Sequence, residues 1–341
     1  MKKILFPLSL MLVSGAAQAI DSDALRLSGF MSVVGGYSSN KDISYNTQPK
    51  FGDTGYEDHF SGNVDTRVGM QLDVKLTDRL SATVQALSHS GNDYDPEASM
   101  AFLRYKLNDE LTLRAGRFGT PFYTYSDFYN VGHAYPWITP PRLAYFIRSE
   151  RGNGLDLTYS TSSGDVDHNV QVYYQNSTER SVLPNGFELK FELNNAWGFV
   201  YSATIDNLSL RAAYHTADLG ILGSDHTANF YTTGGRYEFG RYYVNAEYNA
   251  LRYKDDTSPE TDGWYATLGA YVNDDTQVYV TYEASESDFL GTTTEDEEGF
   301  NAGVRWDLTP SIALKAQYTR YSNNILDEDS NVYRIALDTV F

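Results

Sequence analysis

Residues 62–76 read GNVDTRVGMQLDVKL, and apolar and polar side chains alternate along this stretch one residue at a time. The even positions carry the apolar residues Val64, Val68, Met70, Leu72, Val74 and Leu76. The odd positions carry Asp65, Arg67, Gly69, Gln71, Asp73 and Lys75. Because successive side chains of a strand point to opposite faces, this pattern predicts a β-strand with one apolar and one strongly polar face.

The same alternation recurs along the chain, for example in residues 276–286, 300–308 and 312–319. The strand-like runs are joined alternately by a tight turn and by a longer polar link. The tight turns lie at residues 77–79, 108–110, 161–165, 206–207, 239–240, 273–275 and 309–310. Links that alternate in length in this way are typical of an outer-membrane barrel, with short periplasmic turns and long extracellular loops.

The pattern predicts sixteen strands, at residues 24–37, 62–76, 80–90, 97–107, 111–117, 152–160, 166–176, 196–205, 208–216, 229–238, 241–253, 262–272, 276–286, 298–307, 311–321 and 331–341. Residues 187–193 are an alternative strand, which would extend a hairpin above the membrane. We therefore expect an all-β fold, a transmembrane antiparallel β-barrel. Sixteen strands enclose a lumen too wide for side chains to fill, so the polar face would line water and the apolar face would meet lipid.

The two ends of the chain indicate export to an outer membrane. Residues 1–19 begin with two lysines, continue with a short apolar stretch and end in Ala17-Gln18-Ala19, which predicts a cleaved signal peptide. Residues 20–341 would then form a single β-barrel domain. The last predicted strand ends in Phe341, and a terminal Phe on an alternating strand resembles the signal read by the outer-membrane barrel assembly machinery.

The composition excludes several classes of function. The formal net charge of -19 disfavours nucleic acid as a partner. The chain has no Cys, so neither a disulfide scaffold nor a thiolate metal site is available. Its 28 Tyr residues suit the aromatic girdles found at membrane interfaces. We expect no cofactor and no metal site.

The link between the fifth and sixth predicted strands, residues 118–151, is the longest and is rich in aromatic residues and Pro. Its aromatic residues include Tyr123, Tyr125, Tyr129, Tyr135 and Trp137. Such a composition favours a packed, ordered loop over a solvated one. The rings would either pack this third long loop against the barrel wall or stack on sugar rings as they pass.

Taken together, these features resemble those of the Gram-negative outer-membrane porins, of the general diffusion type. The resemblance rests on the signal peptide, the strand count, the stretch Leu113-Arg114-Ala115-Gly116-Arg117 before the third loop and the terminal Phe. It implies a homotrimer whose third loop folds into each barrel and narrows its pore. The chain lacks the Pro-Glu-Phe-Gly-Gly run of the enterobacterial third loop and has Gly119-Thr120-Pro121-Phe122 instead, so its constriction would be built differently.

In porins of this type, acidic groups of the loop face basic groups of the wall across a narrow gap. We expect Arg67, Arg104 and Arg114, on adjoining strands, to form one basic cluster, and Asp127 of the loop to be its acidic counterpart. The alternative is that these arginines pair with wall carboxylates. The far wall mixes both signs, with Arg211, Arg236, Arg305 and Lys315 beside Glu238, Glu247, Glu283 and Asp307, so ion preference is not readable.

The predicted function is a water-filled channel in the outer membrane of a Gram-negative bacterium, for passive diffusion of ions and small hydrophilic solutes. A substrate-selective porin, for example for oligosaccharides, is the alternative, and a structural, adhesive or hydrolytic barrel is less favoured. Membrane lipid and lipopolysaccharide would surround the barrel. The acidic runs at 255–256, 295–298 and 327–329 are either solvated loops or sites for divalent cations that bridge to lipopolysaccharide.

Overall fold

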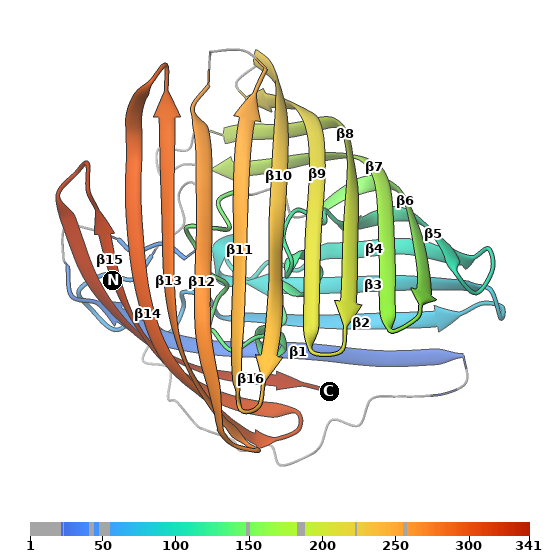
Figure 1. Ribbon diagram of the computed structural model, residues 1–341, viewed down its shortest axis with the longest axis horizontal. Coiled ribbons are helices and arrows are strands. Elements are labelled where there is room, and N and C mark those ends of the chain that lie inside the picture. The colour runs from blue at the N-terminus through green and yellow to red at the C-terminus, as the bar shows by residue number, and fades with distance from the viewer. Residues whose placement is uncertain are drawn as a thin grey trace, which may run out of the picture.

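Sixteen antiparallel strands form a closed barrel in this computed structural model (Figure 1). The structure describes residues 22, 24–40, 44–47, 55–147, 151–182, 188–221, 224–254 and 258–341, so the predicted signal peptide lies outside the described residues. The strands are β1 (Leu25–Ser38), β2 (Arg67–Lys75), β3 (Leu80–His89), β4 (Glu97–Lys106), β5 (Leu111–Gly119), β6 (Arg151–Ser163), β7 (Val166–Val182), β8 (Glu188–Ile205), β9 (Leu208–Ile221), β10 (Ser224–Phe239), β11 (Tyr242–Tyr253), β12 (Glu260–Asn273), β13 (Thr276–Phe289), β14 (Thr292–Thr309), β15 (Ile312–Asn323) and β16 (Glu328–Val340). Each pairs with its neighbours in sequence, and β1 pairs with β16 to close the barrel. The predicted fold is therefore confirmed.

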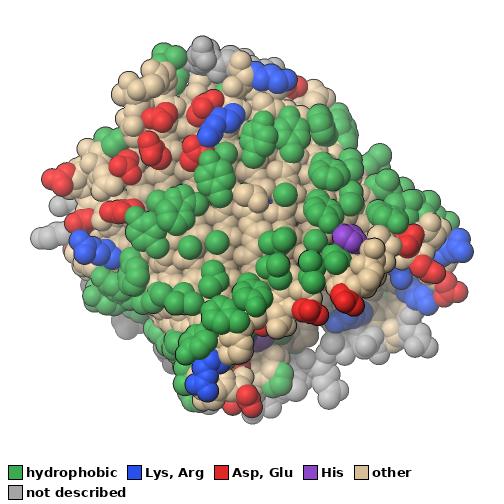
Figure 2. Space-filling model, in the orientation of Figure 1, with side chains coloured by type: hydrophobic (Ala, Val, Ile, Leu, Met, Phe, Trp, Pro, Cys, Tyr) green, Lys and Arg blue, Asp and Glu red, His purple; other side chains and the backbone are tan. Residues whose placement is uncertain are grey.

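The alternating side chains separate as the sequence predicts. In β2, Val68, Met70 and Leu72 are exposed on the outer face, whereas Arg67 points inward and is buried. Figure 2 shows the outer wall from one side, with hydrophobic side chains spread across it and most charged side chains towards its edges. Among the described residues, no helix is long and apolar enough to span a membrane.

The strands on the loop side are longer than predicted. The segment proposed as an alternative strand forms the start of β8, which pairs with the end of β7 from Ser177↔Leu193 to Val182↔Glu188; residue 187 lies outside the described residues. Residues 295–298, expected in a loop, lie within β14, because the β13–β14 hairpin continues as far as Phe289↔Thr292. The acidic residues 255–256 lie outside the described residues.

The second strand begins later than predicted. Asp65 has a φ of 64°, a conformation that a strand does not contain, and β2 starts only at Arg67. The Asp65 carboxylate accepts hydrogen bonds from Thr47 and Tyr56 of the preceding loop. These contacts, which come from residues distant in sequence, hold the local backbone out of the sheet.

The C-terminal residue completes the closure of the barrel. Phe341 exchanges two backbone hydrogen bonds with Gly29 of β1, with N···O distances of 2.9 and 3.0 Å. Its ring lies where a Cβ atom on Gly29 would be, only 2.3 Å from that position. A residue without a side chain is therefore required opposite the terminal Phe.

Candidate pore constriction

The third long loop, residues 120–150, crosses the interior of the barrel. It contains two short 3-10 turns, η2 (Ser126–Phe128) and η3 (Gly132–Ala134). Its residues hydrogen-bond to side chains that point inward from β2, from β7, from β9 to β11 and from β13 to β16. The last part of the loop, residues 148–150, lies outside the described residues.

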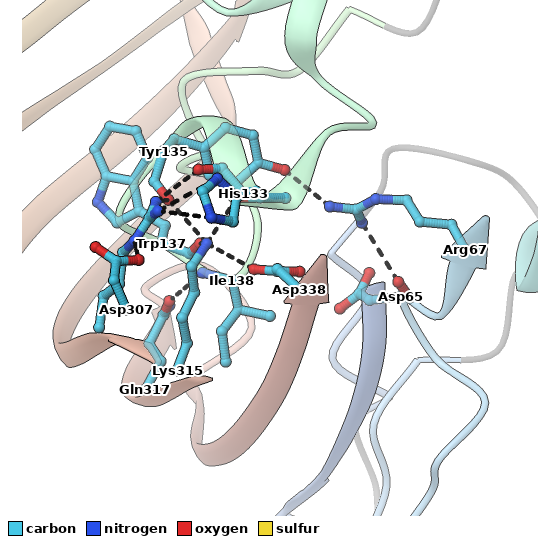
Figure 3. A network of polar contacts seen from close by, with 12 residues as sticks. Asp65, Arg67, His133, Tyr135, Trp137, Ile138, Asp307, Lys315, Gln317 and Asp338 are labelled. Atoms are coloured by element: carbon cyan, nitrogen blue, oxygen red, sulfur yellow. Dashed lines mark hydrogen bonds and ion pairs between the residues drawn. The ribbon is translucent and has the colours of Figure 1, made fainter. Parts of the chain in front are cut away.

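Lys315 of β15 is one of the fully enclosed anchors (Figure 3). Its ammonium group donates to the carbonyl oxygens of Gly132, Tyr135 and Trp137 at 2.7, 2.8 and 2.7 Å. It also lies 2.8 Å from a carboxylate oxygen of Asp338. A buried charge is stable only where it is paired and hydrogen-bonded, and this lysine meets both conditions by holding the loop.

Further wall side chains hold the loop on both sides of this point. Arg305 donates to the carbonyl oxygens of His133 and Tyr135 at 2.6 and 3.1 Å. The buried carboxylates of Glu247 and Glu283 accept from backbone N–H groups of the loop, at Thr124 and Leu143 respectively. Five of the eight far-wall charges therefore serve as partners for the loop backbone, namely Arg211, Arg305, Lys315, Glu247 and Glu283.

Arg67 is also an anchor of the loop. The prediction that it forms one cluster with Arg104 and Arg114 is therefore wrong. The side chain is 2% exposed and donates to the Asn130 carbonyl and the Tyr135 hydroxyl, both at 2.8 Å. Arg67 is the first residue of β2 and so lies at the loop end of the barrel. Arg104 of β4 pairs with Ser81 of β3, which in turn pairs with Lys75 at the turn end of β2. The two arginines are therefore separated by nearly the length of β2.

The aromatic residues of the loop mostly pack on one another. Tyr123, Tyr135 and Trp137 are buried in one cluster, and Tyr125 and Tyr129 pack against it. Tyr123 stacks on Tyr145 with ring centroids 4.1 Å apart. The Trp137 indole N–H donates to Thr281 on the wall. This packing gives the loop a core of its own, which keeps it in place across the lumen.

Arg104 and Arg114 are directly opposite each other on β4 and β5. Both guanidinium groups lie 5.6 Å from the centre of the Phe102 ring. Arg114 forms an ion pair with the buried carboxylate of Asp156 at 2.9 Å, which is the alternative pairing considered from the sequence. Arg104 is exposed, and within the described part of the chain its guanidinium has no hydrogen-bond or ion-pair partner.

Gly116 lets β5 approach β4 closely at this point. Its φ is +133°, which residues with a side chain rarely adopt, and a Cβ there would lie 2.3 Å from the Ala101 carbonyl oxygen. The glycine of the Arg114-Ala115-Gly116 stretch therefore has a structural role beside the arginines.

Asp127 belongs to η2 of the loop. Its side chain is exposed, and among the described residues it has no hydrogen bond or ion pair. It lines a cavity of about 330 Å³ together with Arg211, Arg236 and Asn245 of the wall. It also lines a gap of about 20 Å³ on the other side of the loop, where Gln85 and Arg151 form part of the wall. We call the larger cavity the vestibule.

The charged groups around Asp127 have both signs. Arg114, Arg211 and Arg104 interact electrostatically with its carboxylate, and so does Asp156, which pairs with Arg114. Charges held apart across a narrow wet passage with low-dielectric walls produce a field across that passage. Among the described residues, no group of His, Asp and Glu side chains is arranged to hold a metal ion.

A family model described as Gram-negative porin matches residues 8–326. Solved outer-membrane structures share the fold. In-vitro folded OmpT of Vibrio cholerae matches with a TM-score of 0.65 and 15% identity, over 95% of this chain and 100% of that one. The channel DcaP of Acinetobacter baumannii gives 0.67 and 12%, over 93% and 97%. The anion-selective porin of Comamonas acidovorans gives 0.66 and 15%, over 93% and 99%. A comparison with curated protein sequences finds no match.

Proposed function

Because this chain belongs to the Gram-negative porin family, we propose that ions and small hydrophilic solutes cross its barrel through the passage between the third loop and the wall formed by β4 and β5. The protein is an outer-membrane channel for passive diffusion. In the proposed path, solutes pass between Asp127 on the loop and Arg104 and Arg114 on the wall. The vestibule is the chamber on the turn side of this passage.

The observation that carries this path is the position of Asp127. Its free carboxylate lines both the vestibule and the smaller gap beside β3, β4 and β6, so it is located where the two spaces approach each other. The loop is hydrogen-bonded to β2, to Gln175 of β7, to β9–β11 and to β13–β16. The wall from β3 to β6 is therefore the side on which room for solute remains.

The experiment is conductance of the purified, refolded protein in a planar lipid bilayer. We expect stepwise current increases of uniform size, each from the insertion of one assembly. Arg104→Gln should change the size of the steps, because the group faces the passage. Folded protein that inserts but gives no steps would contradict the function, and unchanged steps in Arg104→Gln would contradict the path.

We also propose a trimer of single-domain barrels, with residues 1–19 removed on export and Phe341 recognised during assembly. The support for assembly is the terminal residue, which completes the pairing of β1 with the end of the chain. Small residues on the outer face, such as Ala212, Ala246 and Ala302, suit close contact between barrels. A heat-labile band of about three times the monomer mass on a mild gel would test the trimer.

We infer that the chain is not an enzyme. A hydrolase needs a nucleophile, a base and an orienting group within hydrogen-bond reach. The most buried histidine, His215, instead contacts the Tyr173 hydroxyl at 2.9 Å and lies edge-on to Phe122. His133 lies beside Arg305. If His133 accepted a proton it would become a cation next to another cation, which disfavours a role as a general base.

A further inference from the structure

We infer that the vestibule is a binding site for an uncharged sugar ring, which stacks on Phe128 of the loop and hydrogen-bonds to free polar groups of β7 and β8. A sugar bound there would lie on the path of the ions, so this inference rests on the proposed function. The cavity of about 330 Å³ is at the small end of the range for ligand pockets, roughly 300–1,000 Å³, so it suits one or two sugar rings.

Phe128 presents an apolar ring to the vestibule from the third loop. The residue is 54% exposed, whereas the tyrosines of the described loop and Trp137 are buried in the aromatic cluster or pack against it. Two backbone hydrogen bonds fix the turn that carries Phe128, one from its N–H to the Tyr125 carbonyl and one from the Val131 N–H to its own carbonyl. The C–H groups on one face of a sugar ring would cover this exposed ring and remove it from water.

The wall of the vestibule offers hydrogen-bonding groups that have no partner among the described residues. Asn169 of β7 and Ser202 of β8 are cross-strand partners, and Gln171 lies two residues further along the same face of β7. The Ser202 hydroxyl has no hydrogen bond within the described chain, and the amides of Asn169 and Gln171 use only their NH₂ groups, which donate to Ser160 and Asp156. Two amide oxygens therefore remain to accept sugar hydroxyls, and the Ser202 hydroxyl can donate or accept.

The charges around the vestibule favour a neutral solute over an anion. Arg236 lies 2.7 Å from Glu238, and Arg211 interacts electrostatically with the buried carboxylate of Glu247. Both arginines therefore have a carboxylate partner of their own. Asp127, which has no ion pair among the described residues, can accept a sugar hydroxyl but would repel an anionic solute.

The test is the current through the refolded protein in a planar bilayer as glucose is added to the electrolyte. A bound ring narrows the path of the ions, so we expect the current to fall to a plateau. Half of the decrease should occur at a millimolar concentration, since a channel must also release what it binds. Sorbitol, an open-chain polyol without a ring face, should cause only the proportional decrease due to the bulk solution. Glucuronate, a similar ring with a carboxylate, should need a higher concentration than glucose.

Phe128→Ala should raise the half-saturating glucose concentration about threefold to tenfold, the order of magnitude expected for one stacked ring. Phe128→Tyr keeps the ring and should keep the original concentration. Ser202→Val should also weaken the effect of glucose, without altering the loop.

Phe60→Ala is the matched control for Phe128→Ala. Phe60 is 67% exposed, and its ring lies against Gly35, on the face of β1 that carries the exposed Val33 and Tyr37. The substitution removes an exposed ring outside the lumen, so the half-saturating glucose concentration should not change. A heat-labile gel band of each variant would confirm that it folds.

Four results would contradict parts of this account. Uniform conductance steps that glucose and sorbitol lower equally would overturn the sugar site and leave the channel intact. A half-saturating glucose concentration that Phe128→Ala and Ser202→Val leave unchanged would overturn the vestibule as the location of the site. Tighter binding of glucuronate than of glucose would overturn the preference for an uncharged ring. Folded protein without any steps would overturn the channel and the inference with it.

Discussion

At the scale of single residues, Lys315 of the barrel wall holds the third loop by hydrogen bonds to three backbone carbonyl oxygens. Breaking a buried ion pair by removing one partner costs about 3–5 kcal/mol, because the remaining charge stays buried. Lys315→Met would leave the Asp338 carboxylate and three loop carbonyls without their donor. We expect this loss in the free energy of unfolding, measured by urea denaturation in detergent micelles.

Lys106→Met is the control for that measurement, since Lys106 is exposed at the end of β4. Lys106→Met should lower the free energy of unfolding by no more than about 0.5 kcal/mol, as for other surface substitutions. Adding Asp338→Asn to Lys315→Met should recover part of the stability, because it removes the unpaired charge. Equal losses for the two lysine variants would show that Lys315 does not carry the anchoring.

Gly132 shows how closely the loop approaches the wall. A Cβ atom at this position would lie 2.3 Å from Asp338 Oδ1 and 2.5 Å from Ser32 Oγ. Gly132→Val should therefore push η3 away from β1 and β16, at a cost of about 1–3 kcal/mol. We expect noisier single-channel current than in the unsubstituted protein.

Gly164→Val is a comparison for Gly132→Val, because a Cβ at Gly164 would meet no atom within 4 Å. That residue is in the turn between β6 and β7 and has a φ of +60°, so the substitution strains a turn without touching the loop. Current noise that rises in the Gly164 variant as much as in the Gly132 variant would refute the specific effect on the loop.

At the scale of elements, the strand pairings of the barrel do not depend on the third loop. All sixteen strand pairings lie outside residues 120–150. Replacing residues 122–147 by a short Gly-Ser linker should therefore leave the barrel folded while it widens the lumen. We expect single-channel conductance to rise roughly twofold or more, since pore width controls the flow of hydrated ions. Conductance at or below the original value in a folded variant would show that the loop does not limit flow.

The strands were predictable from sequence because alternation is a local signal that repeats every two residues. The start of β2 was not, because Asp65 is held by Thr47 and Tyr56 of an earlier loop. The loop anchors were not predictable for the same reason, since Lys315 and Gly132 are 183 residues apart in sequence. Of the predicted pore residues, Arg104 and Arg114 are opposite each other on β4 and β5, whereas Arg67 is hydrogen-bonded to the loop.

At the scale of the whole molecule, the pairing of β1 with β16 closes the barrel, and Phe341 adds the last pair. Deleting Phe341 removes two backbone hydrogen bonds to Gly29 and the ring that packs there. We expect a smaller fraction of heat-labile, folded protein in outer-membrane extracts, whereas Phe341→Tyr should retain most of it. Full assembly of the deletion variant would show that the terminal ring is dispensable.

The absence of Cys from the sequence makes the central claim directly testable. A single Asp127→Cys substitution would be the only thiol in the chain, at the position that we place beside the path of the ions. The measurement is single-channel conductance before and after adding a sulfonate-bearing, thiol-specific reagent, with Ser322→Cys on the outer face of β15 as the control. We expect the reagent to lower the current of the Asp127→Cys channel and to leave the current of the Ser322→Cys channel unaltered. A labelled Asp127→Cys channel with unaltered current would contradict it.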